Sequence, residues 1–207
     1  MGVSLLGSFF AVLLVLWIEK MRLPNLEIIT GEEAHDDITY PPLHPHAGER
    51  WKFFRCIVRN KPFPFPFAWI NRQAAQVCNA KIEFFKPGES RSIFDMLGRW
   101  ASTPEVAYFP DDEKILRMRY PDPITIPANA TEELDVIAKN ENEKCGYGWN
   151  NDAYFPAWRW RTPHYKLDPG SYTVRIQIFP QNGRTFRQEF RLQIGERIED
   201  TLLQTSK

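Results

Sequence analysis

The pattern of apolar and polar residues divides the chain into a continuous apolar start and a remainder in which the two kinds alternate. No charged side chain occurs from Met1 to Ile18, and the run stops at Glu19 and Lys20. Its apolar residues would occupy every face of a helix, which argues against a helix that packs one stripe on a protein core. About 18 uncharged residues are the shortest run expected to cross a bilayer as a helix. The sequence therefore predicts an N-terminal transmembrane anchor over residues 1–22.

Large apolar side chains supply the surface of this anchor that is expected to face lipid: Phe9, Phe10, Leu13, Leu14 and Trp17. A cleaved signal peptide is the main alternative, but the run lacks a basic start and a small-residue cleavage site. Lys20 and Arg22 follow the run, and basic flanks stay in the cytoplasm. We therefore expect a single-pass protein of the cell membrane whose soluble part is cytoplasmic, with the exported orientation as the alternative.

Beyond the anchor, alternation with a period of two predicts short β-strands. The runs 51–60 and 76–86 place small and apolar residues on one face and polar residues on the other. The clearest pair is 172–178 followed by 186–194, where Asn182-Gly183 predicts a tight hairpin turn with positive φ angles. Weaker strands are expected at 115–120 and 132–139. Because strands do not alternate with helices, the fold class predicted is mainly β, an antiparallel β-sandwich.

These patterns predict how the chain is organised. The anchor at 1–22 is followed by a polar, proline-rich connecting segment at 23–49, which includes a short extended run at 26–29. The β-sandwich domain occupies 50–195 and carries an aromatic-rich insertion at 140–166, and 196–207 is expected to be a polar C-terminal tail. The length that remains after the anchor, about 185 residues, is enough to bury one hydrophobic core.

Three segments of the soluble part carry a resemblance to a known group of proteins. They are Arg55-Cys-Ile-Val-Arg-Asn60, the stretch 74–80 that ends in Cys-Asn-Ala, and the stretch 167–175 that begins Leu-Asp-Pro-Gly-Ser-Tyr. In these segments the chain resembles the immunoglobulin-like β-sandwich domains, of the adhesion-module kind, of uncharacterised single-pass membrane proteins from prokaryotes. The resemblance spans roughly residues 50–195. It implies a fold and an anchor, and it carries over no catalytic residue.

Charge and cysteine content narrow the range of partners and compartments. Lys plus Arg equals Asp plus Glu at 26 each, so the net charge is zero and no overall field attracts nucleic acid. The three cysteines, Cys56, Cys78 and Cys145, are an odd number without the spacing of a disulfide framework, which favours a reducing compartment. Cys56 and Cys78 fall on the apolar faces of their strands, as two buried thiols or as a disulfide between neighbouring strands.

The insertion at 140–166 is unusual because aromatic residues with polar tips gather there. Such side chains favour binding surfaces, since each gives a large contact area at a small entropy cost. The candidate binding surface is Tyr147, Trp149, Asn150, Asn151, Tyr154, Trp158 and Trp160. In the alternative interpretation, the insertion closes the end of the sandwich core with its own aromatic side chains.

Catalytic and metal-binding signals are weak in this sequence. Nucleotide-binding glycine loops, G-x-S-x-G and H-E-x-x-H do not occur. The residues that remain as a candidate catalytic group, Cys145, Asp152 and His164, all lie in the insertion. His35-Asp36-Asp37 and His44-x-His46 are metal-ligating types, but a third and a fourth ligand at useful spacing are missing. We therefore expect no metal and no cofactor.

Three functions follow from these features. The anchor, the sandwich and the aromatic insertion favour a membrane-anchored, non-catalytic interaction module, such as an accessory subunit of a larger membrane protein assembly. The first alternative is an exported domain that binds a saccharide or another ligand through the aromatic insertion. The second is a membrane-tethered enzyme of unknown reaction. The expected partners are the membrane and another membrane protein.

Overall fold

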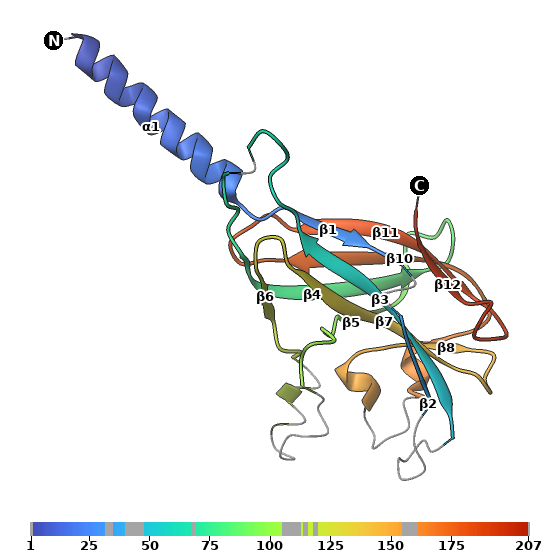
Figure 1. Ribbon diagram of the computed structural model, residues 1–207. Coiled ribbons are helices and arrows are strands. Elements are labelled where there is room, and N and C mark those ends of the chain that lie inside the picture. Colours follow the sequence, from blue (N-terminus) through green and yellow to red (C-terminus); the bar gives the residue numbers. More distant parts are fainter. Residues whose placement is uncertain are drawn as a thin grey trace.

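The computed structural model describes residues 2–31, 35–39, 48–67, 69–104, 113, 116–117, 120–154 and 161–206. A helix, α1 (Gly2–Arg22), extends away from a body made of two antiparallel β-sheets (Figure 1). The sheets pack face to face around a continuous hydrophobic core. The predicted antiparallel β-sandwich is therefore confirmed, while the immunoglobulin-like assignment of its topology stays a prediction.

Strands from both halves of the chain contribute to each sheet. The first sheet contains, in spatial order, β1 (Leu26–Ile29), β3 (Arg50–Asn60), β7 (Thr131–Asn140), β8 (Gly146–Gly148) and β9 (Lys166–Leu167), and β2 (Asp36–Thr39) pairs with β3. The second contains β12 (Leu202–Thr205), β11 (Phe186–Ile194), β10 (Gly170–Phe179), β4 (Ala75–Phe85) and β5 (Ser92–Leu97), and β6 (Ile124–Ile126) pairs with β4. Two short 3-10 helices, η3 (Asn151–Tyr154) and η4 (Pro163–Tyr165), lie in the insertion.

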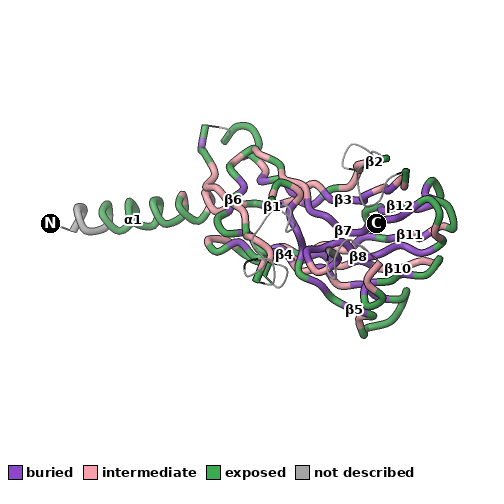
Figure 2. Tube along the Cα trace, turned by 90° about the horizontal axis from the view of Figure 1, so that it is seen from below, coloured by how far each residue is buried: buried purple, intermediate pink, exposed green. Residues whose placement is uncertain are grey.

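The alternating pattern of the sequence sets which face of each strand is buried. Most of the inward side chains predicted for β3, β4, β10 and β11 are buried in one cluster: Phe54, Cys56, Val58, Cys78, Ala80, Ile82, Phe84, Val174, Ile176, Ile178, Phe190, Leu192 and Ile194. Tyr172 and Phe186, also predicted to face inward, are partly buried and pack against this cluster. Figure 2 shows this buried zone running along the strands of the body. Outward residues of β11 such as Arg187 and Arg191 are exposed, so the predicted register is correct.

The link between β10 and β11 differs from the predicted tight turn. The two strands pair as expected, but Ile178 is the last β10 residue in register, opposite Phe186, so a longer loop joins them. Among the described residues that are not glycine, positive φ angles occur at Val77 and Asn129, and Asn182 and Gly183 do not adopt them. Asn182 instead bonds the start of β4, where its Oδ1 accepts from Gln76 N at 2.9 Å and its Nδ2 donates to Ala74 O at 2.9 Å. The prediction of a tight Asn-Gly turn was wrong because this side chain bonds to another strand.

β7 is buried more completely than an alternating strand should be. All seven residues from Leu134 to Asn140 are buried. One face of the strand looks into the main core, and the other contributes Ala138 to a second cluster with Trp51, Phe53, Trp149 and Ala153. Residues of the insertion therefore cover the outer face of the first sheet.

Two further segments differ in detail from the expectations. The expected polar tail at 196–207 contains β12, which pairs with β11 and buries Leu203. In the expected weak strand at 115–120, the described residues Leu116 and Arg117 are helical, and positions 115, 118 and 119 lie outside the described residues. Charged and apolar residues do not alternate strictly at 115–120, so the sequence pattern favoured a strand only weakly.

Helix α1 contacts the sandwich through its last turn, and its apolar side chains point into open space. Every residue from Phe9 to Trp17 is exposed, including all five predicted lipid-facing residues. Their exposed fractions are 60% for Phe9, 66% for Phe10, 45% for Leu13, 55% for Leu14 and 51% for Trp17. In the part of the chain that the structure describes, no helix has both the length and the apolar character required to cross a membrane. That α1 binds lipid stays a prediction.

Candidate functional site

The insertion buries most of the residues proposed as a binding surface. The exposed fractions are 6% for Tyr147, 2% for Trp149, 3% for Asn150 and 4% for Asn151. The Trp149 ring packs against Phe53 with the ring centroids 5.1 Å apart. These four side chains are not an exposed patch, and their burial agrees with the alternative in which the insertion closes the core. The side chains of Tyr154, Trp158 and Trp160 lie outside the described residues.

The two asparagines beside Trp149 bond to the protein's own backbone. Asn150 Oδ1 accepts a hydrogen bond from Ala153 N at 3.0 Å and so caps the start of η3. Asn151 Nδ2 donates to the carbonyl oxygen of Arg117 at 2.8 Å. Short polar side chains of this type commonly replace backbone partners where the chain turns. Asn150 and Asn151 therefore hold the backbone of the insertion in place.

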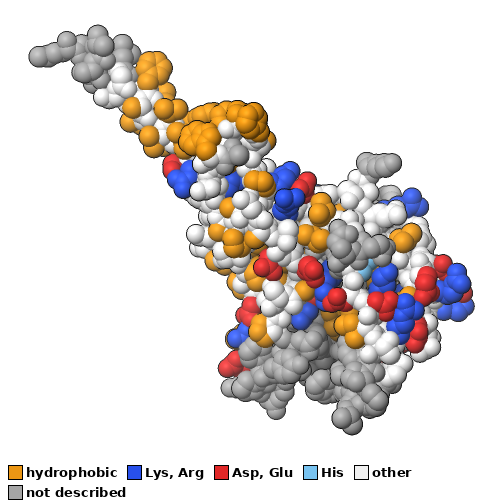
Figure 3. All heavy atoms as spheres, viewed as in Figure 1, with side chains coloured by type: hydrophobic (Ala, Val, Ile, Leu, Met, Phe, Trp, Pro, Cys, Tyr) orange, Lys and Arg blue, Asp and Glu red, His pale blue; other side chains and the backbone are white. Residues whose placement is uncertain are grey.

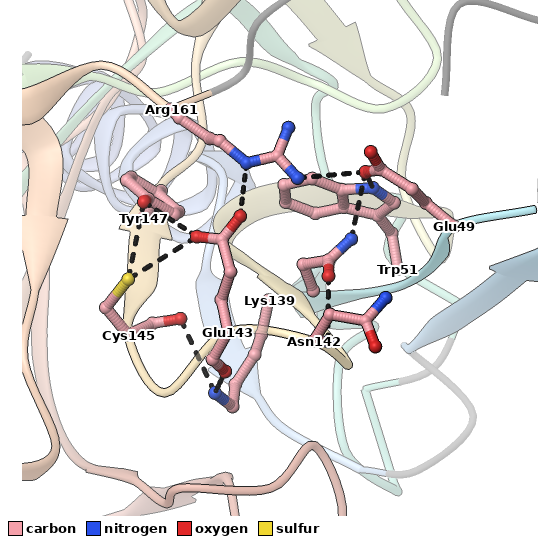
Figure 4. A network of polar contacts seen from close by, with 9 residues as sticks. Glu49, Trp51, Lys139, Asn142, Glu143, Cys145, Tyr147 and Arg161 are labelled. Carbon is pink, nitrogen blue, oxygen red and sulfur yellow. Dashed lines mark hydrogen bonds and ion pairs between the residues drawn. The ribbon is translucent and has the colours of Figure 1, made fainter. Parts of the chain in front are cut away.

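The insertion and the strand β3 beside it share a connected set of polar side chains, which we call the Glu143 network (Figure 4). Glu143 accepts hydrogen bonds from Arg161 Nε and from the Tyr147 hydroxyl, the latter at 2.8 Å. Arg161 Nη2 also donates to Glu49 at 3.0 Å. Glu49 in turn accepts from Trp51 Nε1 at 2.8 Å and from Asn140 Nδ2 at 3.0 Å. One guanidinium thus joins two carboxylates that come from distant parts of the chain.

Lys139 is the most deeply buried cation in this network, with no exposed surface. Its ammonium donates to backbone carbonyl oxygens of four residues, at 2.6 Å to Glu143, 3.0 Å to Lys144, 3.4 Å to Cys145 and 3.4 Å to Glu196. Burial lowers the pKa of Lys139, and Cys145 and Glu143 oppose this shift. A buried amine with a lowered pKa has the chemistry of a nucleophile. Here it is enclosed by carbonyls and has no access to a substrate, so it fastens the 143–145 turn to residue 196.

The structure does not assemble the three residues of the candidate catalytic group. Cys145 is 9% exposed, and its thiol contacts Glu143 Oε2 at 3.5 Å and the Tyr147 hydroxyl at 3.3 Å. Asp152 accepts from the Tyr165 hydroxyl at 3.0 Å, while the His164 ring lies against Phe94 and Tyr165. Among the hydrogen bonds of these three residues, none joins Cys145 to Asp152 or to His164.

The candidate metal ligands in the described part of the connecting segment belong to ion pairs and packing. The His35 ring packs at a tilt against Phe54, with ring centroids 4.8 Å apart. Asp36 pairs with Arg55 at 2.5 Å and Asp37 with Arg50 at 2.6 Å. His44 and His46 lie outside the described residues. Within the described ranges, no group of three or more His, Cys, Asp or Glu side chains gathers around a common point.

The three cysteines are free and buried. Cys56 on β3 and Cys78 on β4 belong to different sheets, so the disulfide between neighbouring strands does not form. Burial raises the pKa of the Cys56 thiol, and it raises that of Cys78 to about 11. Both thiols therefore serve as small core side chains.

A buried ion cluster around Asp135 was missed by sequence reasoning. Asp135 has no exposed surface and accepts hydrogen bonds from Arg99 Nη1 and from Arg55 Nε, the latter at 2.7 Å. Arg99 is 4% exposed. The available signal was a lone acidic residue inside the apolar run Leu134-Asp-Val-Ile-Ala138, because an unpaired carboxylate would be very costly there. That signal implies a cationic partner but does not identify it.

The chain was compared with known protein families, curated proteins and solved structures. No protein-family model, no curated protein and no solved structure matches this chain. The resemblance to immunoglobulin-like domains of membrane proteins therefore stays a prediction.

Replacing Glu143 with Gln should lower the free energy of unfolding by ~1–3 kcal/mol at pH 7, because the charge-assisted hydrogen bond to Arg161 is lost. Burial raises the pKa of Glu143, but the hydrogen bonds from Arg161 and Tyr147 outweigh it, so the net pKa is lowered. A carboxyl with a depressed folded-state pKa stabilises above its unfolded value of about 4.3 and loses that contribution as the pH falls through the folded pKa. Urea unfolding at pH 7 and pH 3 measures the free energy of unfolding of the wild-type chain and of Glu143→Gln. The difference between the two chains should be smaller at pH 3.

The matched control for this prediction is Glu89→Gln, because Glu89 is exposed in the turn between β4 and β5. This change should alter the free energy of unfolding by less than ~0.5 kcal/mol at both pH values. Equal stability of Glu143→Gln and the wild-type chain at pH 7 would contradict a stabilising role for the network.

Proposed function

We propose that the protein is a membrane-anchored, non-catalytic interaction module, in which α1 inserts into the lipid bilayer as a single-pass anchor and holds the β-sandwich at the membrane surface. The observation that carries this proposal is the all-round exposure of apolar side chains on α1 from Phe9 to Trp17. Figure 3 shows apolar side chains along the helix where it leaves the body. Apolar surface costs about 25 cal/mol per Å² when water covers it, and lipid removes that cost.

The charges that follow the apolar run support one orientation for the sandwich. Lys20 and Arg22 stand in the last turn of α1, and Arg22 pairs with Glu19 at 2.9 Å. Basic residues beside an anchor favour the cytoplasmic side, where we therefore place the sandwich. The free state of Cys56, Cys78 and Cys145 is consistent with that compartment. An exposed cysteine introduced as Leu202→Cys should react with an impermeant maleimide in broken cells and not in intact cells.

Two features support a protein partner over an enzymatic reaction. The Glu143 network and the Asp135 cluster pair their charges within the protein, and Lys139, Cys145 and Asp135 are buried. The second sheet ends at β5, whose outward residues Ile93 and Leu97 are each 43% exposed. Sheet edges with exposed apolar side chains are common docking positions for other chains. An accessory subunit of a membrane protein assembly fits these properties, and the immunoglobulin-like assignment of the fold would agree with such a role.

Deleting residues 1–18 should leave a folded domain that is soluble without detergent. The deletion keeps Met21 and Arg22, which bond to the loop between β3 and β4, and it removes no residue of the main core. Thermal unfolding of the truncated chain should therefore be cooperative and occur close to the temperature of the full chain in detergent. An unfolded truncation product would show that α1 belongs to the core of the domain, against the proposal.

A further inference from the structure

The loop between β3 and β4, residues 61–74, presents an unusual set of exposed aromatic side chains. The exposed fractions are 92% for Phe65, 42% for Phe67 and 75% for Trp69. Phe63 and Ile70 of the same loop point inward, at 9% and 8% exposed. Prolines at positions 62, 64 and 66 fix φ at three places, which reduces the entropy lost when the loop meets a partner. Large apolar rings held outward on a stiff loop indicate a contact surface.

This loop is bonded directly to the last turn of α1. Arg72 Nη1 donates to the carbonyl oxygens of Met21 and Leu23, each at 3.1 Å. Gln73 N donates to the carbonyl oxygen of Arg22 at 2.7 Å. Arg72 also lies over the Phe63 ring, 4.0 Å from its centroid, which holds the loop in place. Figure 1 shows the loop beside the end of α1, and Figure 3 shows apolar side chains gathered at that point.

Cationic side chains mark the same level of the molecule. Lys20, Arg72 and Arg184 line a cavity of about 460 Å³ at the base of α1, together with apolar residues that include Leu23 and Phe63, and its lining contains no acidic residue. Cations near an exposed apolar surface match the layer of lipid headgroups, where phosphates lie above the acyl chains. The apolar helix, the aromatic loop and the cationic cavity thus meet at the base of α1, as expected at a membrane boundary.

We infer that the loop 61–74 is a second membrane contact, which inserts Phe65, Phe67 and Trp69 into the lipid interface beside α1. The inference rests on the proposed function and adds an orientation to it. A single helix leaves the sandwich free to tilt, whereas a helix and an adjacent loop fix which end of the sandwich faces the membrane. The opposite end, with the turn between β4 and β5 and the start of β12, then points away from the lipid.

The test measures how strongly a nitroxide lipid quenches a fluorescent label. The label is attached to single cysteines introduced into the full chain. Trp17→Cys reports on α1, Phe67→Cys on the loop, and Leu202→Cys is the matched control because Leu202 and Phe67 are both 42% exposed. The native cysteines are buried, and the chain without an introduced cysteine gives the background of labelling. Each chain is labelled with an environment-sensitive maleimide and reconstituted in vesicles of phosphatidylcholine and phosphatidylglycerol. Some of these vesicles contain a lipid with a nitroxide near the headgroup.

We expect several-fold quenching by the nitroxide at positions 17 and 67 and little at 202. Quenching at 17 with a loop signal equal to that at 202 would overturn the inference and leave the helix anchor intact. Quenching at 67 without quenching at 17 would keep the loop contact and overturn the anchor. No quenching at either position would overturn both. Phe65→Cys is a second loop position, and thermal unfolding of each labelled chain confirms that the substitution leaves the fold intact.

Discussion

Replacing Asp135 with Ala is expected to lower the free energy of unfolding by ~3–5 kcal/mol, because the change removes a fully buried carboxylate that two arginines share. Asp135 has no exposed surface, and its carboxylate bonds Arg99 and Arg55 at once. Arg55 keeps contacts to Glu133 and Asp36 after the substitution. Arg99 is 4% exposed and loses its bonded carboxylate inside the protein. The expected loss of stability is large because water cannot easily reach this buried position to replace the missing carboxylate oxygens.

Denaturant unfolding of Asp135→Ala and Asp95→Ala measures this effect against a control. Asp95 pairs with Lys81 at 3.2 Å on the surface of β5, with 53% of its side chain exposed. Exposed pairs of this kind contribute ~0–1 kcal/mol. A loss of similar size in both variants would mean that the Asp135 cluster is not a buried, mutually dependent group.

The second large effect is expected for Trp149→Ala, which should destabilise the domain by ~3–5 kcal/mol by opening a cavity in the second core cluster. Trp149 is 2% exposed and packs against Phe53. Trp69→Ala is the matched control, because the same change is made at a ring that is 75% exposed. Its effect on thermal unfolding should be small. A Trp149→Ala variant that unfolds at the wild-type temperature would restore the interpretation of the insertion as an exposed binding patch.

Much of the β-sandwich could be predicted because one face of each long strand must be apolar. In β4 and β10, alternation placed Ile82 and Ile176 in the core, and the structure buries both. The same rule failed for β7, since alternation assumes that one face meets water. The insertion covers that face, so Trp51 and Phe53 on β3 are buried beside it. The period of a strand reflects its own residues and does not show that another segment covers its outer face.

The candidate site was harder to predict, since residue type does not separate packing from binding. Trp149 in the insertion and Trp69 in the loop 61–74 are the same residue type, yet Trp149 is 2% exposed and Trp69 is 75% exposed. Sequence reasoning placed the binding surface in the insertion and did not single out the loop 61–74. The bond from Arg72 to the carbonyl of Met21 joins residues 51 positions apart, and such contacts become visible only in the folded chain.

The central claim is that α1 holds this sandwich at a membrane, and vesicle flotation tests it most directly. The full chain and the chain that lacks residues 1–18 are mixed with phosphatidylcholine vesicles during removal of detergent and are then centrifuged through a density gradient. We predict that the full chain floats with the vesicles, even in high salt, and that the truncated chain stays at the bottom. A full chain that stays at the bottom as a soluble, folded protein would contradict the account.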